Sequence, residues 1–176
     1  CRSYRRFNQS AAVEMKTLRQ LVDLARHTSS AMNQQPLRYI LSTDPAANDR
    51  IFPRLTWAGY LKDWPGPDEG QRPPAYIVVA ADRQAGRWTD CDLGIACQSI
   101  LLGAVERGLG GCIIAAIKRE ALAEDLDLPE TLKILVVLAI GEPAEEVVIE
   151  PLGEDGDFKY WRDADGAHHV PKRALD

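Results

Sequence analysis

The chain has 176 residues, of which 45% are hydrophobic and 27% are charged, and its formal net charge is −5. This length and composition are typical of one globular domain, so a single domain over residues 1–176 is expected. An acidic chain without an apolar run of about 18 residues is expected to bind neither nucleic acid nor a membrane.

The cysteines show no C-x-x-C pair and no spacing typical of metal ligands, so no metal site is expected. They are Cys1, Cys91, Cys97 and Cys112. Reduced and mostly buried thiols fit this distribution, and a cytoplasmic location is therefore expected.

The first half of the chain contains amphipathic segments separated by polar loops. Apolar residues at helical spacing predict helices over about residues 12–26 and 46–60. Between them, the polar stretch 28–35 is typical of a loop, and 38–41 is a candidate short strand. The proline- and glycine-rich stretch 64–70 is another loop, too short to separate two domains.

The second half of the chain is dominated by apolar segments. Strands are predicted at 75–81, 112–117 and 132–140, and a short helix at 119–126. A long helix is predicted over 90–107, and its lack of a polar face indicates burial in the domain centre or against a second subunit. Because strands and helices are mixed without regular βαβ units, an α+β domain is predicted, with one sheet packed on this helix.

Two glycines in the predicted long helix and three aromatic residues in the tail give further predictions about packing. Gly94 and Gly103 each weaken the predicted long helix, which indicates a close approach of another backbone at both positions. After Pro151 the chain is polar, and three aromatic residues are expected to anchor this tail: Phe158, Tyr160 and Trp161.

Familiar catalytic motifs are absent from the sequence. The run from Gly108 to Gly111 follows a helix and lacks the spacing of a dinucleotide-binding loop, so Gly108 is expected to end that helix. His168 and His169 are adjacent, and neighbouring side chains of an extended segment point apart, which argues against a metal site there. Neither a nucleophile elbow nor a zinc-protease motif is present.

Both ends of the chain are basic. Arg2, Ser3 and Arg5 precede the first helix, and Lys172 and Arg173 stand near the other end. Arginine presents a planar fork of donors and serine adds a hydroxyl, a combination suited to phosphate oxygens. If the two ends meet in space, they form a local positive site on an acidic protein; the alternative for the N-terminal cluster is a solvated basic terminus.

Three segments in this order resemble the FMN-dependent nitroreductase family: R-S-x-R at 2–5, S-A-x-N-x-Q-P at 30–36, and the basic ending P-K-R at 171–173. Supporting similarities lie at 72–77 (RPPAYI) and across 92–112. The resemblance covers nearly the whole chain. It implies a nitroreductase-like α+β fold, a mostly antiparallel central sheet flanked by helices, a long buried central helix, and a homodimer.

The resemblance also implies FMN as the cofactor, held at the subunit interface. The residues implied to hold the FMN phosphate are Arg2, Ser3, Arg5, Lys172 and Arg173. The residues implied to reach the flavin ring from the partner subunit are Ser29, Ser30 and Asn33. The segment implied to lie along the isoalloxazine, with the backbone N–H of Ala115 donating to flavin N5, comprises Ile113, Ile114, Ala115 and Ala116.

The implied activity is electron transfer from NAD(P)H to nitroaromatics, quinones or similar acceptors by a ping-pong mechanism. FMN does the chemistry, and no catalytic side chain is expected. Two other readings stay open: a specialised flavoenzyme of the flavin-destroying or reductive dehalogenating type, and a non-catalytic FMN-binding protein.

Some details follow the family less closely. Many members carry a basic residue where this chain has Cys1, and the chain is too short for the helices that cover the pocket in larger members. A cation is expected near the reduced flavin, with Lys62 and Arg38 as candidates. Trp57 and Trp64 are candidate walls of the pocket, with core packing as the alternative for each.

Overall fold

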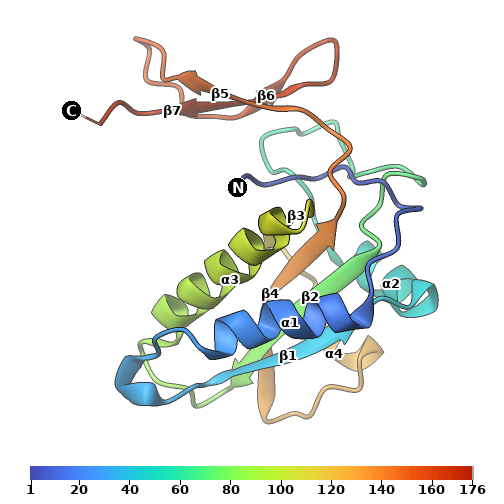
Figure 1. The fold of residues 1–176 in the computed structure, drawn as a ribbon, viewed down its shortest axis with the longest axis vertical. Helices are drawn as coiled ribbons and strands as arrows, with labels where there is room; N and C mark the ends of the chain where they lie inside the picture. Colours follow the sequence, from blue (N-terminus) through green and yellow to red (C-terminus); the bar gives the residue numbers. More distant parts are fainter. Residues whose placement is uncertain (176) are drawn as a thin grey trace.

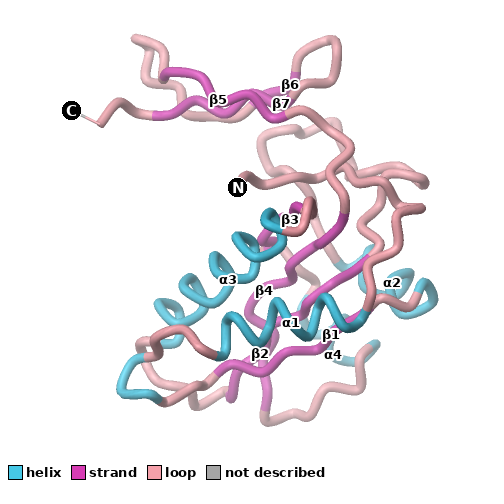
Figure 2. The backbone as a smooth tube through the Cα atoms, viewed as in Figure 1, coloured by secondary structure: helices cyan, strands magenta, loops and turns pink. Residues whose placement is uncertain are grey.

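A four-stranded sheet forms the centre of the computed structural model, which describes residues 1–175 (Figures 1 and 2). Its strands in spatial order are β1 (Leu37–Ser42), β2 (Ala75–Asp82), β4 (Leu132–Gly141) and β3 (Gly110–Ile114). Every neighbouring pair is antiparallel. The predicted α+β class with an antiparallel central sheet is confirmed, although β3 begins and ends earlier than the predicted 112–117.

Helices cover both faces of this sheet, as Figure 1 shows. On one face lie α1 (Met15–Arg26) and α3 (Thr89–Glu106), which pack against each other. On the other face lie α2 (Pro45–Ile51), the 3-10 turn η2 (Phe52–Arg54) and α4 (Arg119–Asp125). A second 3-10 turn, η1 (Ala31–Asn33), follows α1.

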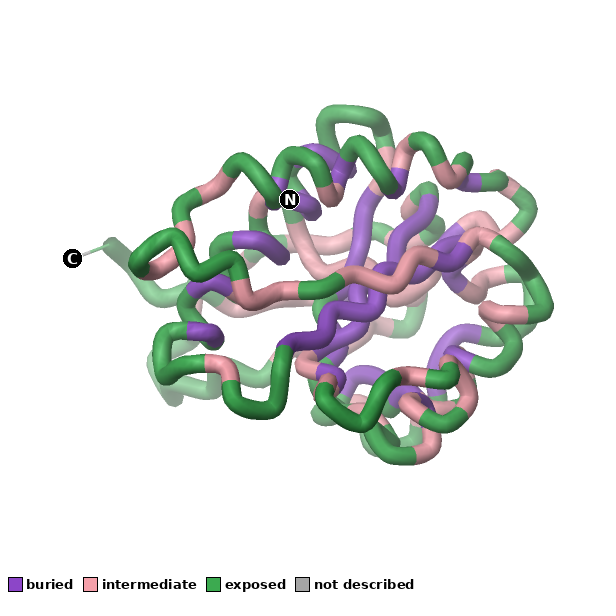
Figure 3. Tube along the Cα trace, turned by 90° about the horizontal axis from the view of Figure 1, so that it is seen from below, coloured by how far each residue is buried: buried purple, intermediate pink, exposed green. Residues whose placement is uncertain are grey.

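This two-sided cover explains why the core strands are apolar throughout. Along β2, Ala75, Ile77 and Val79 pack with α1 and α3, whereas Tyr76 and Val78 pack with the helices of the opposite face. Successive side chains of a strand point to opposite faces, so a strand covered on both sides carries apolar residues at every position. In Figure 3 the buried residues gather on these central strands.

The second predicted helix, over residues 46–60, is wrong in its length. α2 ends at Ile51 and is followed only by η2. Pro53 has no backbone N–H to continue the helical hydrogen bonds. Beyond it the chain turns to the segment that follows β3, where Leu55 forms an antiparallel bridge with Ile117.

The long helix α3 is present as predicted, but in the single chain it is buried on one side only. At Gly103 an added Cβ would clash with the side chains of Leu24 and Leu21, so α1 does pack closely there, but through side chains and not through the backbone that was predicted. At Gly94 an added Cβ would meet nothing within 4 Å, so the same prediction is wrong within the described chain. The large apolar side chains of α3 that remain exposed are Ile95, Leu102 and Val105.

Residues 145–173, here called the C-terminal arm, form a second small sheet that their polar composition does not predict. Its strands in spatial order are β5 (Val147–Pro151), β7 (His168–Lys172) and β6 (Trp161–Arg162). In Figure 1 the arm lies beside the N-terminus, apart from the central sheet. Tyr160 and Phe158 anchor the tail as predicted, since their ring centroids lie 4.9 and 6.5 Å from that of Tyr60, outside the arm. Trp161 stacks on His169 within the arm itself.

Within residues 1–175, every helix is too short or too polar to cross a membrane.

Candidate cofactor site

The basic N-terminal segment lies along β3. Ser3 forms a parallel bridge with Gly111, and the Tyr4 N–H donates to the Gly111 carbonyl at 3.0 Å. An added Cβ would lie 2.5 Å from the Tyr4 ring at Gly110 and 2.6 Å from the Ala139 carbonyl oxygen at Gly111. Gly110 therefore allows the N-terminal segment to approach β3, whereas Gly111 allows β3 to pack closely on β4 and on Leu101 of α3.

The turn before β3 has the conformation expected from the sequence. Gly108 has a φ of 72°, a left-handed conformation that glycine adopts without steric cost at the end of a helix. Its predicted role in ending α3 is confirmed, and the turn leads directly into the strand beside the N-terminal segment.

The two basic ends of the chain meet in a cavity of about 600 Å³ between the N-terminal segment and the arm, here called the basic cavity. Its basic and hydroxyl lining residues are Arg2, Ser3, Arg5, Lys172 and Arg173. The rest of its lining consists of Phe158, Tyr160, His168, Val170 and Pro171. All five residues predicted for phosphate binding thus come together, and among residues 1–175 no carboxylate lines this cavity.

Within the basic cavity, Arg5 is held from two sides. Its guanidinium carbon lies 4.6 Å from the centre of the Tyr160 ring, a cation–π contact. Its Nη1 lies 2.9 Å from Nε2 of His168. Both contacts come from the arm, so the arm fixes where this cation stands.

Glu145 joins the arm to the N-terminal segment. Its Oε1 accepts from the backbone N–H groups of Arg5 and Arg6, and its Oε2 lies 2.9 Å from Nη2 of Arg162. The carboxylate side chain is 1% exposed and that of Arg162 is 11% exposed. Three donors satisfy this buried carboxylate, while burial and the nearby Arg6 lower the pKa of Arg162.

His168 is buried and neutral. Burial first of all, and then the charges of Arg5 and Arg162, together lower its pKa to about 4. Because arginine has only N–H groups to offer, the 2.9 Å contact makes Nε2 of His168 the acceptor and leaves the ring proton on Nδ1.

His169 points the opposite way, as predicted for adjacent residues of an extended segment. Its ring stacks on Trp161 with centroids 4.1 Å apart, and its two nitrogens lie 3.1 Å from carboxylate oxygens of Glu150 and Asp163. The hydrogen bond to Asp163 is the main cause that raises the pKa of His169. No group of three or more His, Cys, Asp or Glu that could hold a metal ion occurs in the described part of the chain.

Sequence reasoning alone misses His168, Tyr160 and Glu145 as parts of this site. One signal could have found His168. Alternate residues of a strand share a face, so the predicted phosphate ligand Lys172 places Val170 and His168 on the same side of β7, and all three line the basic cavity. Tyr160 and Glu145 carry no comparable signal, since their roles depend on how the arm folds back.

The segment implied to lie along the flavin begins in β3 and leaves the sheet. Ile114 is buried, whereas Ile113, Ala115 and Ala116 are exposed. The Ala115 carbonyl accepts from Nη2 of Arg119 at 2.8 Å, which holds the backbone just after the strand. The structure therefore presents two small exposed residues, Ala115 and Ala116, directly after β3, the strand whose Gly111 pairs with Ser3.

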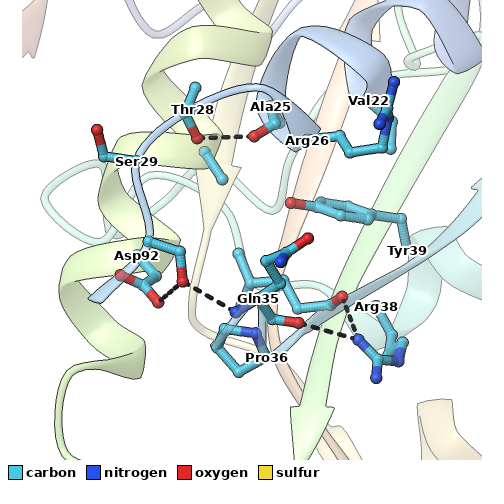
Figure 4. Close-up of a pocket in the computed structure, with 13 residues that line it drawn as sticks. Val22, Ala25, Arg26, Thr28, Ser29, Gln35, Pro36, Arg38, Tyr39 and Asp92 are labelled. Atoms are coloured by element: carbon cyan, nitrogen blue, oxygen red, sulfur yellow. Dashed lines mark hydrogen bonds between the residues drawn. The ribbon is translucent and has the colours of Figure 1, made fainter. Parts of the chain in front are cut away.

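The S-A-x-N loop lies elsewhere, at the N-terminal end of α3, where Ser29 and Ser30 line a separate cavity of about 250 Å³ (Figure 4). The Ser30 hydroxyl donates to Asp92 Oδ2 at 2.7 Å and accepts from the Gln35 N–H at 2.9 Å, so it holds the loop in place. Asn33 is exposed with a φ of 54°. A single chain does not bring these three residues to the basic cavity.

The remaining candidates of the sequence stand outside the basic cavity. Trp57 is buried in the core, with its ring 5.9 Å from that of Phe52, so core packing is its role here. Trp64 packs under the guanidinium of Arg162 at 4.5 Å. Arg38 Nη1 donates to two backbone carbonyls near the start of β1, and Lys62 is exposed in a loop.

Comparison with known proteins agrees with this architecture. Residues 2–142 match the model of the nitroreductase family, and the arm lies beyond the matched segment. A nitroreductase family protein from Clostridium novyi NT shares the fold with a TM-score of 0.66 and 24% identity, over 81% of this chain and 80% of that one.

Two further solved structures share the fold at lower identity. An FMN-dependent nitroreductase from Clostridium difficile R20291 has a TM-score of 0.66 and 22% identity, over 82% of this chain and 84% of that one. A variant of an FMN- and NADPH-dependent nitroreductase from Sphigopyxis sp. strain HMH has a TM-score of 0.64 and 19% identity, over 81% and 84%. A search of curated proteins gave no match.

Proposed function

We propose that this chain, which belongs to the nitroreductase family, binds FMN and passes electrons from NAD(P)H to a small aromatic or quinone acceptor. The observation that carries the proposal is the basic cavity, where the R-S-x-R segment and the P-K-R ending meet. Similar folds in an FMN-dependent nitroreductase and in an FMN- and NADPH-dependent one support the choice of cofactor and electron donor.

The residues of the basic cavity fit a phosphate monoester. Four cationic side chains and the hydroxyls of Ser3 and Tyr160 line it, and no carboxylate of residues 1–175 competes for them. Arginine forks and a lysine make short, charge-assisted hydrogen bonds to phosphate oxygens. In this proposal the phosphate of FMN is held by Arg2, Ser3, Arg5, Lys172 and Arg173.

The neighbouring backbone suggests where the flavin ring lies. Ser3 pairs with Gly111, so the segment that follows in β3 runs directly away from the phosphate residues. Ala115 and Ala116 are small and exposed, which leaves room for a flat ring to approach the backbone. When bound, FMN supplies the hydride and electron transfer, and the chain's own residues bind, orient and shield it.

A homodimer is part of the proposal. The exposed apolar side chains on α3 are Ile95, Leu102 and Val105, and a second copy of the chain is the natural cover for them. Because Ser29, Ser30 and Asn33 lie at the other end of α3 from the basic cavity, they reach a flavin only from the partner subunit.

The test is an absorbance spectrum of the purified protein followed by anaerobic addition of NADH or NADPH. The expected result is a flavin spectrum that bleaches and that recovers when a quinone or nitroaromatic is added. If bound flavin stays oxidised with both donors, the chain is instead a non-catalytic FMN-binding protein or a specialised flavoenzyme. A colourless protein that cannot be loaded with FMN would overturn the proposal.

A further inference from the structure

We propose that His168 and Tyr160 are positioning residues, which fix the guanidinium of Arg5 in the orientation that grips the FMN phosphate. This inference rests on the proposed function. It adds a role for the arm beyond carrying Lys172 and Arg173, and it concerns a part of the chain outside the segment that matches the family model.

The geometry leaves Arg5 little freedom. The Tyr160 ring covers its guanidinium at 4.6 Å, and Nε2 of His168 accepts from Nη1 at 2.9 Å. The same two arm residues contact each other, with ring centroids 5.0 Å apart. One face and one N–H of the guanidinium are thereby occupied, and its other N–H groups are left for a ligand in the basic cavity that all three residues line.

His168 suits this role because it is an uncharged acceptor. A carboxylate at the same place would neutralise Arg5 and compete with the phosphate, whereas a neutral imidazole orients the cation and leaves its charge intact. His168 is 1% exposed, so water does not replace it as the partner of Arg5.

Among the cations of the basic cavity, Arg5 is the one for which positioning by neighbouring side chains matters most. Lys172 and Arg173 are exposed, and Lys172 makes no ion pair within residues 1–175. A long side chain that is already ordered loses less conformational freedom when it binds a ligand. We therefore expect the held arginine to contribute a disproportionate share of the phosphate affinity.

The test compares dissociation constants for FMN and for riboflavin, which lacks the phosphate, in wild type, His168→Leu and His168→Gln. His168→Leu is expected to weaken FMN binding about tenfold and to leave riboflavin binding unchanged. His168→Gln is expected to restore much of the loss, because its side-chain oxygen can accept from Arg5. His169→Gln, at the adjacent residue that points away, is the matched control and should bind FMN as wild type does.

A double-mutant cycle shows whether His168 acts through Arg5. In an Arg5→Ala background, His168→Leu is expected to have no further effect on FMN affinity. Tyr160→Leu should repeat the selective loss of FMN affinity, and Tyr160→Phe, which keeps the ring, should not. These two variants carry the test if His168→Leu does not fold.

The possible results distinguish a failure of this inference from a failure of the proposed function. Unchanged FMN affinity in His168→Leu and Tyr160→Leu would overturn the inference and leave the proposed function standing. An equal loss for FMN and riboflavin, or additive effects in the cycle, would show a merely structural role. Wild-type protein that does not bind FMN would remove the proposed function and this inference together.

Discussion

The guanidinium of Arg5 and the imidazole of His168 lie 163 positions apart in the chain, yet Nη1 of one is 2.9 Å from Nε2 of the other. This contact joins the N-terminal segment to the C-terminal arm and makes one cavity from both ends of the sequence. Nε2 of His168 can accept this hydrogen bond only while the imidazole is neutral. The docking of the arm on the N-terminal segment therefore depends on pH.

The first prediction is that the arm detaches as the solution becomes acidic. The pKa of His168 is about 4 in the docked arm, below its ordinary value of 6.5. Between these values the free arm binds a proton that the docked arm does not, so docking is at full strength above about pH 6.5 and weakens as the pH falls toward 4. The expected loss reaches about 3 kcal/mol near pH 4.

Limited proteolysis of the arm between pH 4 and 7 measures this effect, and His168→Gln, which has no proton to gain, should lack the acid-induced cleavage. The charged and titratable groups that act on His168 are Arg5, Arg162, His169 and Arg2. His169 works in the opposite sense: its pKa is raised, so its contribution is complete at low pH and is lost as the pH rises through that raised value. Equal acid sensitivity in wild type and His168→Gln would contradict the assignment to His168.

The second prediction concerns the arginines proposed to bind the FMN phosphate. Arg2→Ala combined with Arg5→Ala removes two charge-assisted contacts and is expected to weaken FMN binding about 100-fold or more. The purified double variant should be colourless, and its affinity for added FMN should depend less on salt than that of wild type. Arg50→Ala is the control, because Arg50 of α2 donates to the backbone carbonyl of Asp125 on the other face of the sheet and does not line the basic cavity. Full flavin occupancy in the double variant would contradict the phosphate assignment.

The central fold could be predicted from the sequence because its strands and helices follow from local residue patterns. A strand covered on both faces carries a continuous apolar run, as β2 does over 75–81 and β4 over 134–140, and a helix that ends at a glycine such as Gly108 carries its own signal. The error at residues 46–60 is local as well: helical periodicity continued past Pro53, and the missing N–H of that proline decided the outcome.

The fold of the arm could not be predicted in this way, because the residues that make its contacts follow no helical or strand periodicity. Glu145 is recognised as a site residue only once its carboxylate meets the backbone of the N-terminal segment. Tyr160 likewise gains its role from the position of Arg5. The basic ends could be recognised in the sequence as candidate phosphate ligands, but the side chains that hold them could not, since a polar tail offers no hydrophobic pattern that predicts how it folds back.

The third prediction tests why β3 begins with two glycines. In Gly111→Ala, the new Cβ would lie 2.6 Å from the Ala139 carbonyl oxygen of β4, so β3 must shift and carry the bridged Ser3 with it. The expected cost is about 2–3 kcal/mol in the free energy of unfolding, measured by urea denaturation, together with weaker FMN binding as Ser3 moves. In Gly59→Ala the new Cβ would meet nothing within 4 Å, and this control should unfold as wild type does. Equal stability of both variants would show that the strand yields freely at Gly111.

The fourth prediction concerns the exposed side of α3, where Leu102 is 53% exposed. If a second copy covers this face, Leu102→Asp buries a charge in an apolar interface and is expected to yield a monomer in light scattering. Ala46→Asp, which adds the same charge to the exposed helix α2 on the other face of the sheet, should leave the mass unchanged. The monomer is also expected to lose FMN, because Asn33 of the partner subunit no longer reaches the flavin. A Leu102→Asp monomer that keeps its flavin would show that one chain completes the site, and the role proposed for Asn33 would then be wrong.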